Sequence, residues 1–149
     1  SYMSEFIWKD QIKVSCREVT RGEQFDIYND VRRLGLLDNI TLDNAIQQDE
    51  RIAELIAVRA TVAVYDCTPA KNSGAGKNKW HEADKVFDIP LPMTADGFNA
   101  LPKSLANGWI ECAVRDNEDV LSVMSFPSAN VRSSNVGSEL KSESESSKT

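Results

Sequence analysis

Residues 6–23, with the sequence FIWKDQIKVSCREVTRGE, decide how the fold begins. Within this stretch Ile12, Val14 and Cys16 alternate with polar residues, which is the period of a strand that buries one face. A short polar link joins this strand to residues 6–8, and the pair predicts a β-hairpin. Because an isolated two-stranded hairpin is marginal in water, we expect it to pack against the helices that follow.

The same stretch ends on the start of a helix. Thr20 and Glu23 have the spacing of a capping box, in which each side chain bonds the backbone N–H of the other residue. Gly35 stands where a helix C-terminus is expected, after Arg32 and Arg33, whose charges suit that end of the helix dipole. The pattern predicts a helix between these signals, with an apolar face made by Phe25, Ile27, Tyr28, Val31 and Leu34.

A second helix is expected to begin at Thr41, which can cap it. Its end is ambiguous, because Ala60, Val62 and Val64 alternate with other residues as in a strand. No Gly, Pro or turn cluster separates this run from the helix, so we predict one long helix over 41–65. Its apolar stripe consists of Leu42, Ala45, Ile46, Ile52, Ala53 and Ile56.

The outer side of this helix is acidic, with Asp43, Asp49, Glu50 and Glu54. The ordinary interpretation is a solvated surface, and the alternative is a docking face for a basic partner. We take Asp49, Glu50 and Glu54 as candidate partner-binding residues. Trp8 and Trp109 are further candidates, although core packing is the simpler explanation for both.

The rest of the chain predicts a basic loop over 68–79, an extended segment over 80–92, a short helix capped by Thr94 and a helix that starts near Pro102. Residues 127–149 are rich in Ser and poor in apolar side chains, so we expect them to be disordered. Ser1 and Tyr2 precede Met3 and are interpreted as a tag remnant. The predicted fold class is α+β, with a mainly helical domain at 3–126, an N-terminal β-hairpin and a disordered C-terminal tail.

The composition excludes several classes of protein. The 149 residues include 17 Lys and Arg against 23 Asp and Glu, and the net charge of −6 argues against a nucleic-acid partner. No apolar stretch approaches the ~20 residues of a membrane helix, and no signal peptide is visible. Cys16, Cys67 and Cys112 form no paired motif and are expected to be reduced thiols in a cytoplasmic protein.

No motif in the sequence predicts catalysis, a cofactor or a metal. Residues 74–77, GAGK, resemble a phosphate-binding loop, but Lys71 and Asn78 stand where that motif needs Gly and Ser or Thr. His81 is the only histidine and has no set of metal ligands around it in the sequence. We therefore expect a protein that is not an enzyme, with a small enzyme of unrecognised type as an alternative.

The order of elements and four short segments resemble a known family. The segments are VTRGE at 19–23, RATVAVYD at 59–66, PLPMT at 90–94 and LPKSL at 101–105. Over residues 6–114 the chain resembles the tail assembly chaperones of long-tailed, siphovirus-type bacteriophages. The likeness rests on loose motifs and an arrangement of elements, without a catalytic signature.

The resemblance implies a non-enzymatic protein of the host cell cytoplasm. Such chaperones bind the tape measure protein, help recruit major tail tube subunits, and are absent from the mature virion. Many are also made in a longer form by a ribosomal frameshift. Self-association along the partner is a further expectation, because one small domain covers only a short part of a helix that rises ~1.5 Å per residue. The alternative is a structural tail or neck component that stays in the particle.

Overall fold

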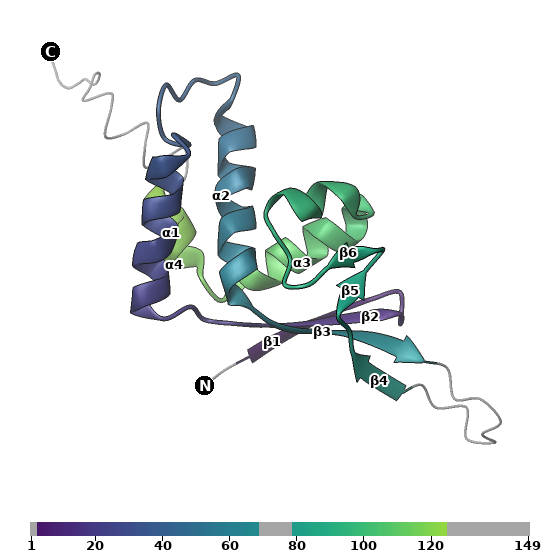
Figure 1. Cartoon of the computed structure of the whole chain (residues 1–149). Helices are drawn as coiled ribbons and strands as arrows, with labels where there is room; N and C mark the ends of the chain where they lie inside the picture. The colour runs from purple at the N-terminus through teal and green to yellow at the C-terminus, as the bar shows by residue number, and fades with distance from the viewer. Residues whose placement is uncertain (1–2, 69–78, 125–149) are drawn as a thin grey trace, which may run out of the picture.

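The computed structural model describes residues 3–68 and 79–124, and it has an α+β fold, as predicted (Figure 1). The predicted tail 127–149, most of the basic loop and residues 1–2 lie outside the described residues. The elements are β1 (Met3–Trp8), β2 (Ile12–Arg17), α1 (Arg21–Arg33), α2 (Ala45–Ala60), β3 (Thr61–Thr68), β4 (Lys79–Glu82), β5 (Lys85–Val86), β6 (Ile89–Pro90), the 3-10 helix η1 (Asp96–Ala100), α3 (Lys103–Arg115) and α4 (Glu118–Met124).

The main sheet has the order β1-β2-β3-β4, and all of its strands pair antiparallel. The predicted hairpin is confirmed as β1 and β2, and its register runs from Trp8 opposite Ile12 to Met3 opposite Arg17. Lys9 and Asp10 have φ values of 50° and 55°, as the two central residues of a type I′ turn require. Beyond the hairpin, β3 and β4 extend the sheet, and β5 and β6 form a small second sheet.

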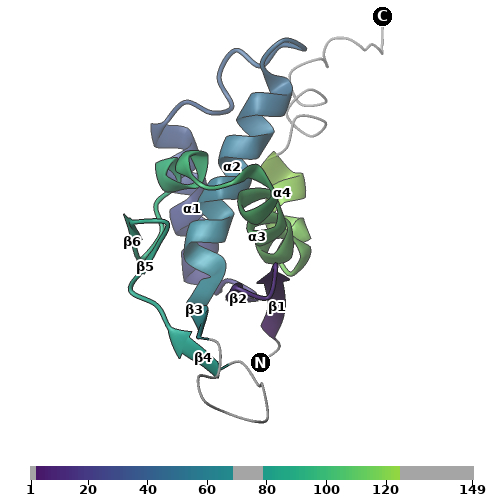
Figure 2. The ribbon, with the colours of Figure 1, turned by 90° about the vertical axis from the view of Figure 1, so that its right-hand side faces the viewer.

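The helices cover one face of the main sheet (Figures 1 and 2). Among the helices that follow the hairpin, α3 is the one on which it mainly packs, rather than α1, the helix that carries Phe25. Two contacts explain this difference. The Trp8 indole N–H donates to the Ser104 hydroxyl at 2.9 Å, and Phe6 lies so close to Gly108 that a Cβ there would overlap its ring. The hairpin can therefore pack closely on α3 because Gly108 has no side chain at the point of contact.

The buried side of α1 is narrower than predicted. Ile27 and Val31 are buried, whereas Phe25 and Leu34 are largely exposed. On α2, Ile52, Ala53 and Ile56 are buried as expected. The predicted stripe fails at Leu42 and Ile46, which are 83% and 79% exposed, although Ala45 between them is buried. The helix begins at Ala45 rather than at Thr41, so Leu42 lies outside it.

The single helix predicted over 41–65 is wrong, because α2 ends at Ala60 and β3 begins at the next residue. Thr61 is the residue at which the backbone changes from helical to extended, with φ −75° and ψ 122°. Its hydroxyl donates to the Ala57 carbonyl at 2.6 Å and accepts from the Trp109 indole N–H at 2.8 Å. A long-range contact therefore ends the helix where the local sequence has no turn signal.

Asn117 joins the end of α3 to the segment between β2 and α1. It is fully buried, and its Oδ1 accepts from the Val19 backbone N–H at 2.9 Å. Its Nδ2 donates to the carbonyls of Ala113 at 2.8 Å and Arg17 at 3.1 Å. One side chain thus satisfies three backbone groups that two distant parts of the chain bring together.

Candidate functional site

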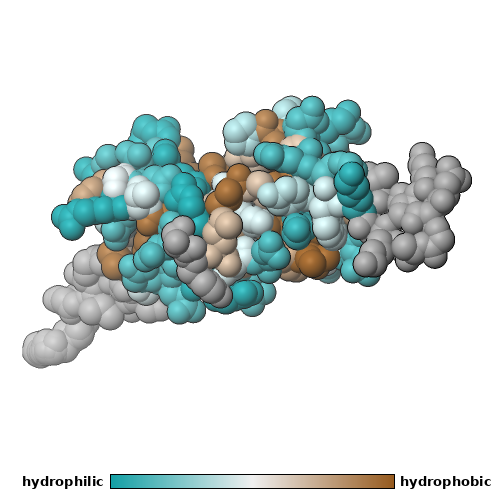
Figure 3. All heavy atoms as spheres, turned by 90° about the horizontal axis from the view of Figure 1, so that it is seen from below, coloured by the Kyte–Doolittle hydropathy of each residue, from teal (hydrophilic) through white to brown (hydrophobic). Residues whose placement is uncertain are grey.

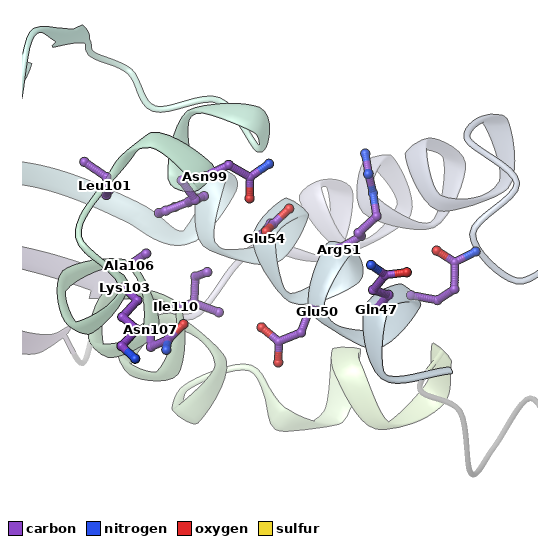
Figure 4. A pocket seen from close by; sticks show the side chains of 12 residues that line it. Gln47, Glu50, Arg51, Glu54, Asn99, Leu101, Lys103, Ala106, Asn107 and Ile110 are labelled. Atoms are coloured by element: carbon purple, nitrogen blue, oxygen red, sulfur yellow. The ribbon is translucent and has the colours of Figure 1, made fainter. Parts of the chain in front are cut away.

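A groove of about 550 Å³ lies between α2 and the segment that contains η1 and α3 (Figure 4). The α2 wall is polar and consists of Gln47, Gln48, Glu50, Arg51 and Glu54. The opposite wall consists of Asn99, Lys103 and Asn107. The floor is apolar and consists of Phe98, Leu101, Ala106 and Ile110.

Regular helix geometry places the polar walls. Residues three and four positions apart lie on one face of a helix, so Gln47, Glu50 and Glu54 share a side of α2. The opposite wall begins at η1, whose N-cap is Ala95 rather than the predicted Thr94. The Thr94 hydroxyl still accepts from the Gly97 backbone N–H at 3.1 Å. Pro102 then precedes the first turn of α3.

The floor of the groove is held by the core beneath it. Phe98 is buried and meets the Trp109 ring edge to face, with ring centroids 5.2 Å apart. Trp109 is in turn fixed by its hydrogen bond to Thr61. Since the floor rests on packed aromatic rings, a ligand would meet a preformed surface there.

The groove carries charged side chains of both signs. Glu50 and Glu54 share the α2 wall with Arg51, and Lys103 lies on the opposite wall. Arg51 forms a long ion pair with Asp96, with 4.0 Å between nitrogen and oxygen. Burial of the Glu54 carboxyl raises its pKa above the ordinary value, with Arg51 opposing this shift and Glu50 and Asp96 adding to it.

The amide side chains of the groove are free to bind a ligand. Within residues 3–68 and 79–124, no side-chain hydrogen bond engages Gln47, Gln48, Asn99 or Asn107. Each amide carries two N–H donors and one acceptor oxygen. The walls therefore offer both hydrogen-bonding directions around an apolar floor, an arrangement that suits a polar chain with a hydrophobic side.

The candidate partner-binding residues divide into two groups. Glu50 and Glu54 line the groove, and Asp49 lies beside them on α2 but does not line it. Trp8 is 8% exposed and Trp109 is 0% exposed, so neither side chain offers a surface to a partner. Their assignment as partner-binding residues is corrected to core packing, since the indole N–H groups find partners inside the protein.

His81 does not line the groove. His81 is exposed on β4, opposite Asp66 on β3, and residues 74–77 lie outside the described residues. Among the residues that the structure describes, no group of three or more His, Cys, Asp and Glu side chains is placed to hold a metal ion.

The face of the main sheet opposite the helices is open, and Figure 3 shows apolar patches among the polar surface there. Met3, Ile7 and Val62 are each about half exposed. The Lys13 ammonium lies over the rings of Tyr65 and Trp80, 4.9 and 5.3 Å from their centroids. In these cation–π contacts the Lys13 side chain covers part of the two rings, while its charged ammonium group stays in contact with water.

Comparison of the chain with protein-family models, curated proteins and solved structures finds no match. None of the helices within 3–68 and 79–124 has the length and apolar character needed to cross a lipid bilayer.

Proposed function

We propose that this protein is a non-enzymatic binding protein that holds a helical segment of another protein in the groove between α2 and α3. The observation that carries the proposal is the lining of this groove, where amide and charged walls flank a buried apolar floor. An amphipathic helix has the matching surface, with an apolar stripe bordered by polar side chains.

Two exposed apolar side chains extend this surface beyond the groove. Ile46 lies one helical turn before Glu50 on α2, and Leu42 lies in the turn that precedes this helix. Exposed aliphatic groups of this size are candidates for burial in a complex. A partner helix that follows α2 would cover Ile46 while its apolar stripe rests on the floor of the groove.

The resemblance to tail assembly chaperones supplies the proposed identity of the partner. In this role the protein binds the tape measure protein in the host cytoplasm, helps recruit tail tube subunits and leaves before the virion is complete. Polar groove walls and a net charge of −6 suit a protein that keeps an apolar partner in solution.

Co-expression with the tape measure protein of the same phage tests the proposal. We expect the tape measure protein to become soluble and to co-purify with the full chain. Asn107→Trp, which fills the mouth of the groove, should lower the recovered complex at least tenfold. The matched control is Asn29→Trp, the same change at an exposed position of α1, and it should leave the recovered complex unchanged.

The proposal fails if the tape measure protein is equally insoluble with and without this protein. Detection of the protein in purified virions would then favour the alternative role as a structural tail or neck component.

A further inference from the structure

Two of the three cysteines meet in the core between the hairpin and α3. Cys16 lies on β2 and Cys112 on α3, both side chains are fully buried, and all three cysteines are free thiols. We propose that Cys16 and Cys112 are a redox-active pair, which hydrogen peroxide converts into a disulfide that joins β2 to α3. The proposal is independent of the binding role, because neither cysteine lines the groove.

One row of α3 residues faces the hairpin, on which this helix packs (Figure 2). Gly108, Cys112 and Asp116 follow one another at intervals of four residues, so they lie on one side of the helix. Gly108 lies against the Phe6 ring, and the Asp116 carboxylate accepts from the Ser4 hydroxyl at 2.9 Å. These two contacts with β1 lie on either side of Cys112, so its side chain is directed at the hairpin.

The register of the hairpin brings Cys16 to the same place. Ser4 on β1 is the partner of Cys16 on β2. The Cys16 sulfur also lies 3.9 Å from the Thr61 hydroxyl, which accepts from the Trp109 indole N–H. Trp109 and Cys112 are three positions apart on α3, so they are neighbours on the helix surface. The contacts of α3 with Ser4 and Thr61 therefore lie on both sides of Cys16, and Cys112 lies between them.

A hydrogen bond between the two thiols sets the order in which they react. The Cys16 thiol donates to the Cys112 sulfur, and this bond lowers the pKa of the Cys112 thiol. The positive charge of Arg115 acts in the same direction, while burial and the carboxylates of Asp116 and Glu111 oppose it. Because a thiolate is the nucleophile in cysteine chemistry, Cys112 is the residue that attacks the oxidant.

The reaction consumes one molecule of hydrogen peroxide and releases two of water. The Cys112 thiolate attacks one oxygen of the peroxide, the O–O bond breaks, and Cys112 becomes a sulfenic acid. The hydroxide that leaves takes up the proton that Cys112 had released. The Cys16 sulfur then attacks the sulfenic sulfur, the S–O bond breaks, and the Cys16 proton leaves with the hydroxyl group as the second water. The two thiols lose two electrons, and the peroxide gains them.

The fold allows the oxidant to enter and the bond to form. The strand β1 lies at an edge of the main sheet, where local opening admits a small uncharged molecule. A disulfide requires Cα atoms within about 7 Å of each other, and Gly108 permits the close approach of α3 to the hairpin. The bond would close a loop that contains α1, α2 and β3, and it would tie one wall of the groove to the sheet.

Peptide mapping of the full chain after treatment with hydrogen peroxide tests the proposal. The remaining thiols are blocked with iodoacetamide in urea, and the tryptic peptides are analysed without reduction. We expect one bridge, between the peptides that contain Cys16 and Cys112, and dithiothreitol should reverse it. The control is the same treatment of the chain unfolded in urea, where bridges to Cys67 should predominate because they close shorter loops.

Cys112→Ser should form no bridge, whereas the matched variant Cys67→Ser should form it as the wild type does. If Cys112→Ser does not fold, the peptide map of the wild type decides alone. The bridged protein should also unfold at a higher urea concentration than the reduced protein, because the bridge closes a long loop of the unfolded chain. Unbridged Cys16 and Cys112 after peroxide treatment, a bridge to Cys67 in the folded protein, or a lower urea midpoint of the bridged form would each overturn the inference.

Discussion

Replacing Asn117 by Leu should remove a large part of the stability of the domain. The change keeps a side chain of similar volume but deprives the buried Val19 N–H of its acceptor, and it deprives the carbonyls of Ala113 and Arg17 of a donor. A buried backbone group left without a partner costs roughly 1–3 kcal/mol. Because carbonyls tolerate a lost bond better than an N–H group does, we expect a total loss of about 3–5 kcal/mol.

Urea unfolding followed by tryptophan fluorescence measures this loss, because Trp8 and Trp109 are both buried in the core. With a typical slope of about 2 kcal/mol per molar urea, the midpoint should fall by roughly 2 M. Asn107→Leu is the control, since Asn107 is exposed on the same helix and makes no side-chain hydrogen bond within the described residues. It should change the free energy of unfolding by less than about 0.5 kcal/mol.

Asn117→Asp refines the test. This variant keeps the acceptor for Val19 but places a second oxygen against the carbonyls of Ala113 and Arg17. Burial and these carbonyls should raise the pKa of the new carboxyl. Its folded form then holds the proton more tightly than the unfolded form, so the variant should gain stability relative to the wild type as the pH falls from 7 to 5.

A loss below about 1 kcal/mol for Asn117→Leu would show that the three hydrogen bonds do not hold α3 in place.

Three further predictions concern the hairpin and the start of α1. Gly108→Ala should cost about 1–3 kcal/mol, because its methyl group overlaps the Phe6 ring, and an unchanged melting temperature would contradict this packing. Trp8→Ala should cost roughly 3–5 kcal/mol in urea unfolding, and a loss under about 1 kcal/mol would place Trp8 at the surface. The two hydrogen bonds from Arg17 and the Thr20 cap lower the pKa of Glu23 to about 2. The folded pKa lies below the unfolded value, so this contribution is present above about pH 4.5 and is lost as the pH falls toward 2. The Arg17–Glu23 ion pair contributes about 1 kcal/mol to the free energy of unfolding, because solvent screens this partly exposed pair. Glu23→Gln should therefore reduce, by about this amount, the stability that the protein loses between pH 4.5 and pH 2 in urea unfolding.

The parts of the fold that could be predicted are those fixed by neighbouring residues. Both bonds of the capping box are present, at 3.1 Å to the Thr20 hydroxyl and 2.8 Å to the Glu23 carboxylate. Gly35 follows α1 with φ +67°, a conformation that favours glycine. The hairpin could be predicted for the same reason, because its alternation of apolar and polar residues and its turn lie within a few residues of each other.

The point at which α2 ends and β3 begins could not be predicted, because it depends on a residue far along the chain. Thr61 is fixed by Trp109, which lies 48 positions away. The alternation of Ala60, Val62 and Val64 was a correct sign of a strand, but their burial does not follow it. Val62 is exposed and Val64 is buried, because the pairing of β2 with β3 has an irregularity between Ser15 and Cys16.

One wall of the candidate site could be predicted from the sequence, and the other could not. The pattern of α2 placed Glu50 and Glu54 on its polar side, and both line the groove. The wall formed by Asn99 and Asn107 has no sequence signal, because it meets α2 only through the packing of α3 in the folded protein. The ordinary interpretation of the acidic side was a solvated surface, with a docking face as the alternative, and in the structure the Glu54 side chain is half-buried.

The direct passage from α2 into β3 has a genetic consequence. An extra codon between Ala60 and Thr61 would have no loop to absorb it. The helix would turn by about 100° relative to the strand, or the strand would slip by one residue and turn Val64 out of the core. In-frame insertions and deletions at this junction should therefore be selected against as strongly as nonsense mutations, and a library of inserted peptides should return no functional clone there.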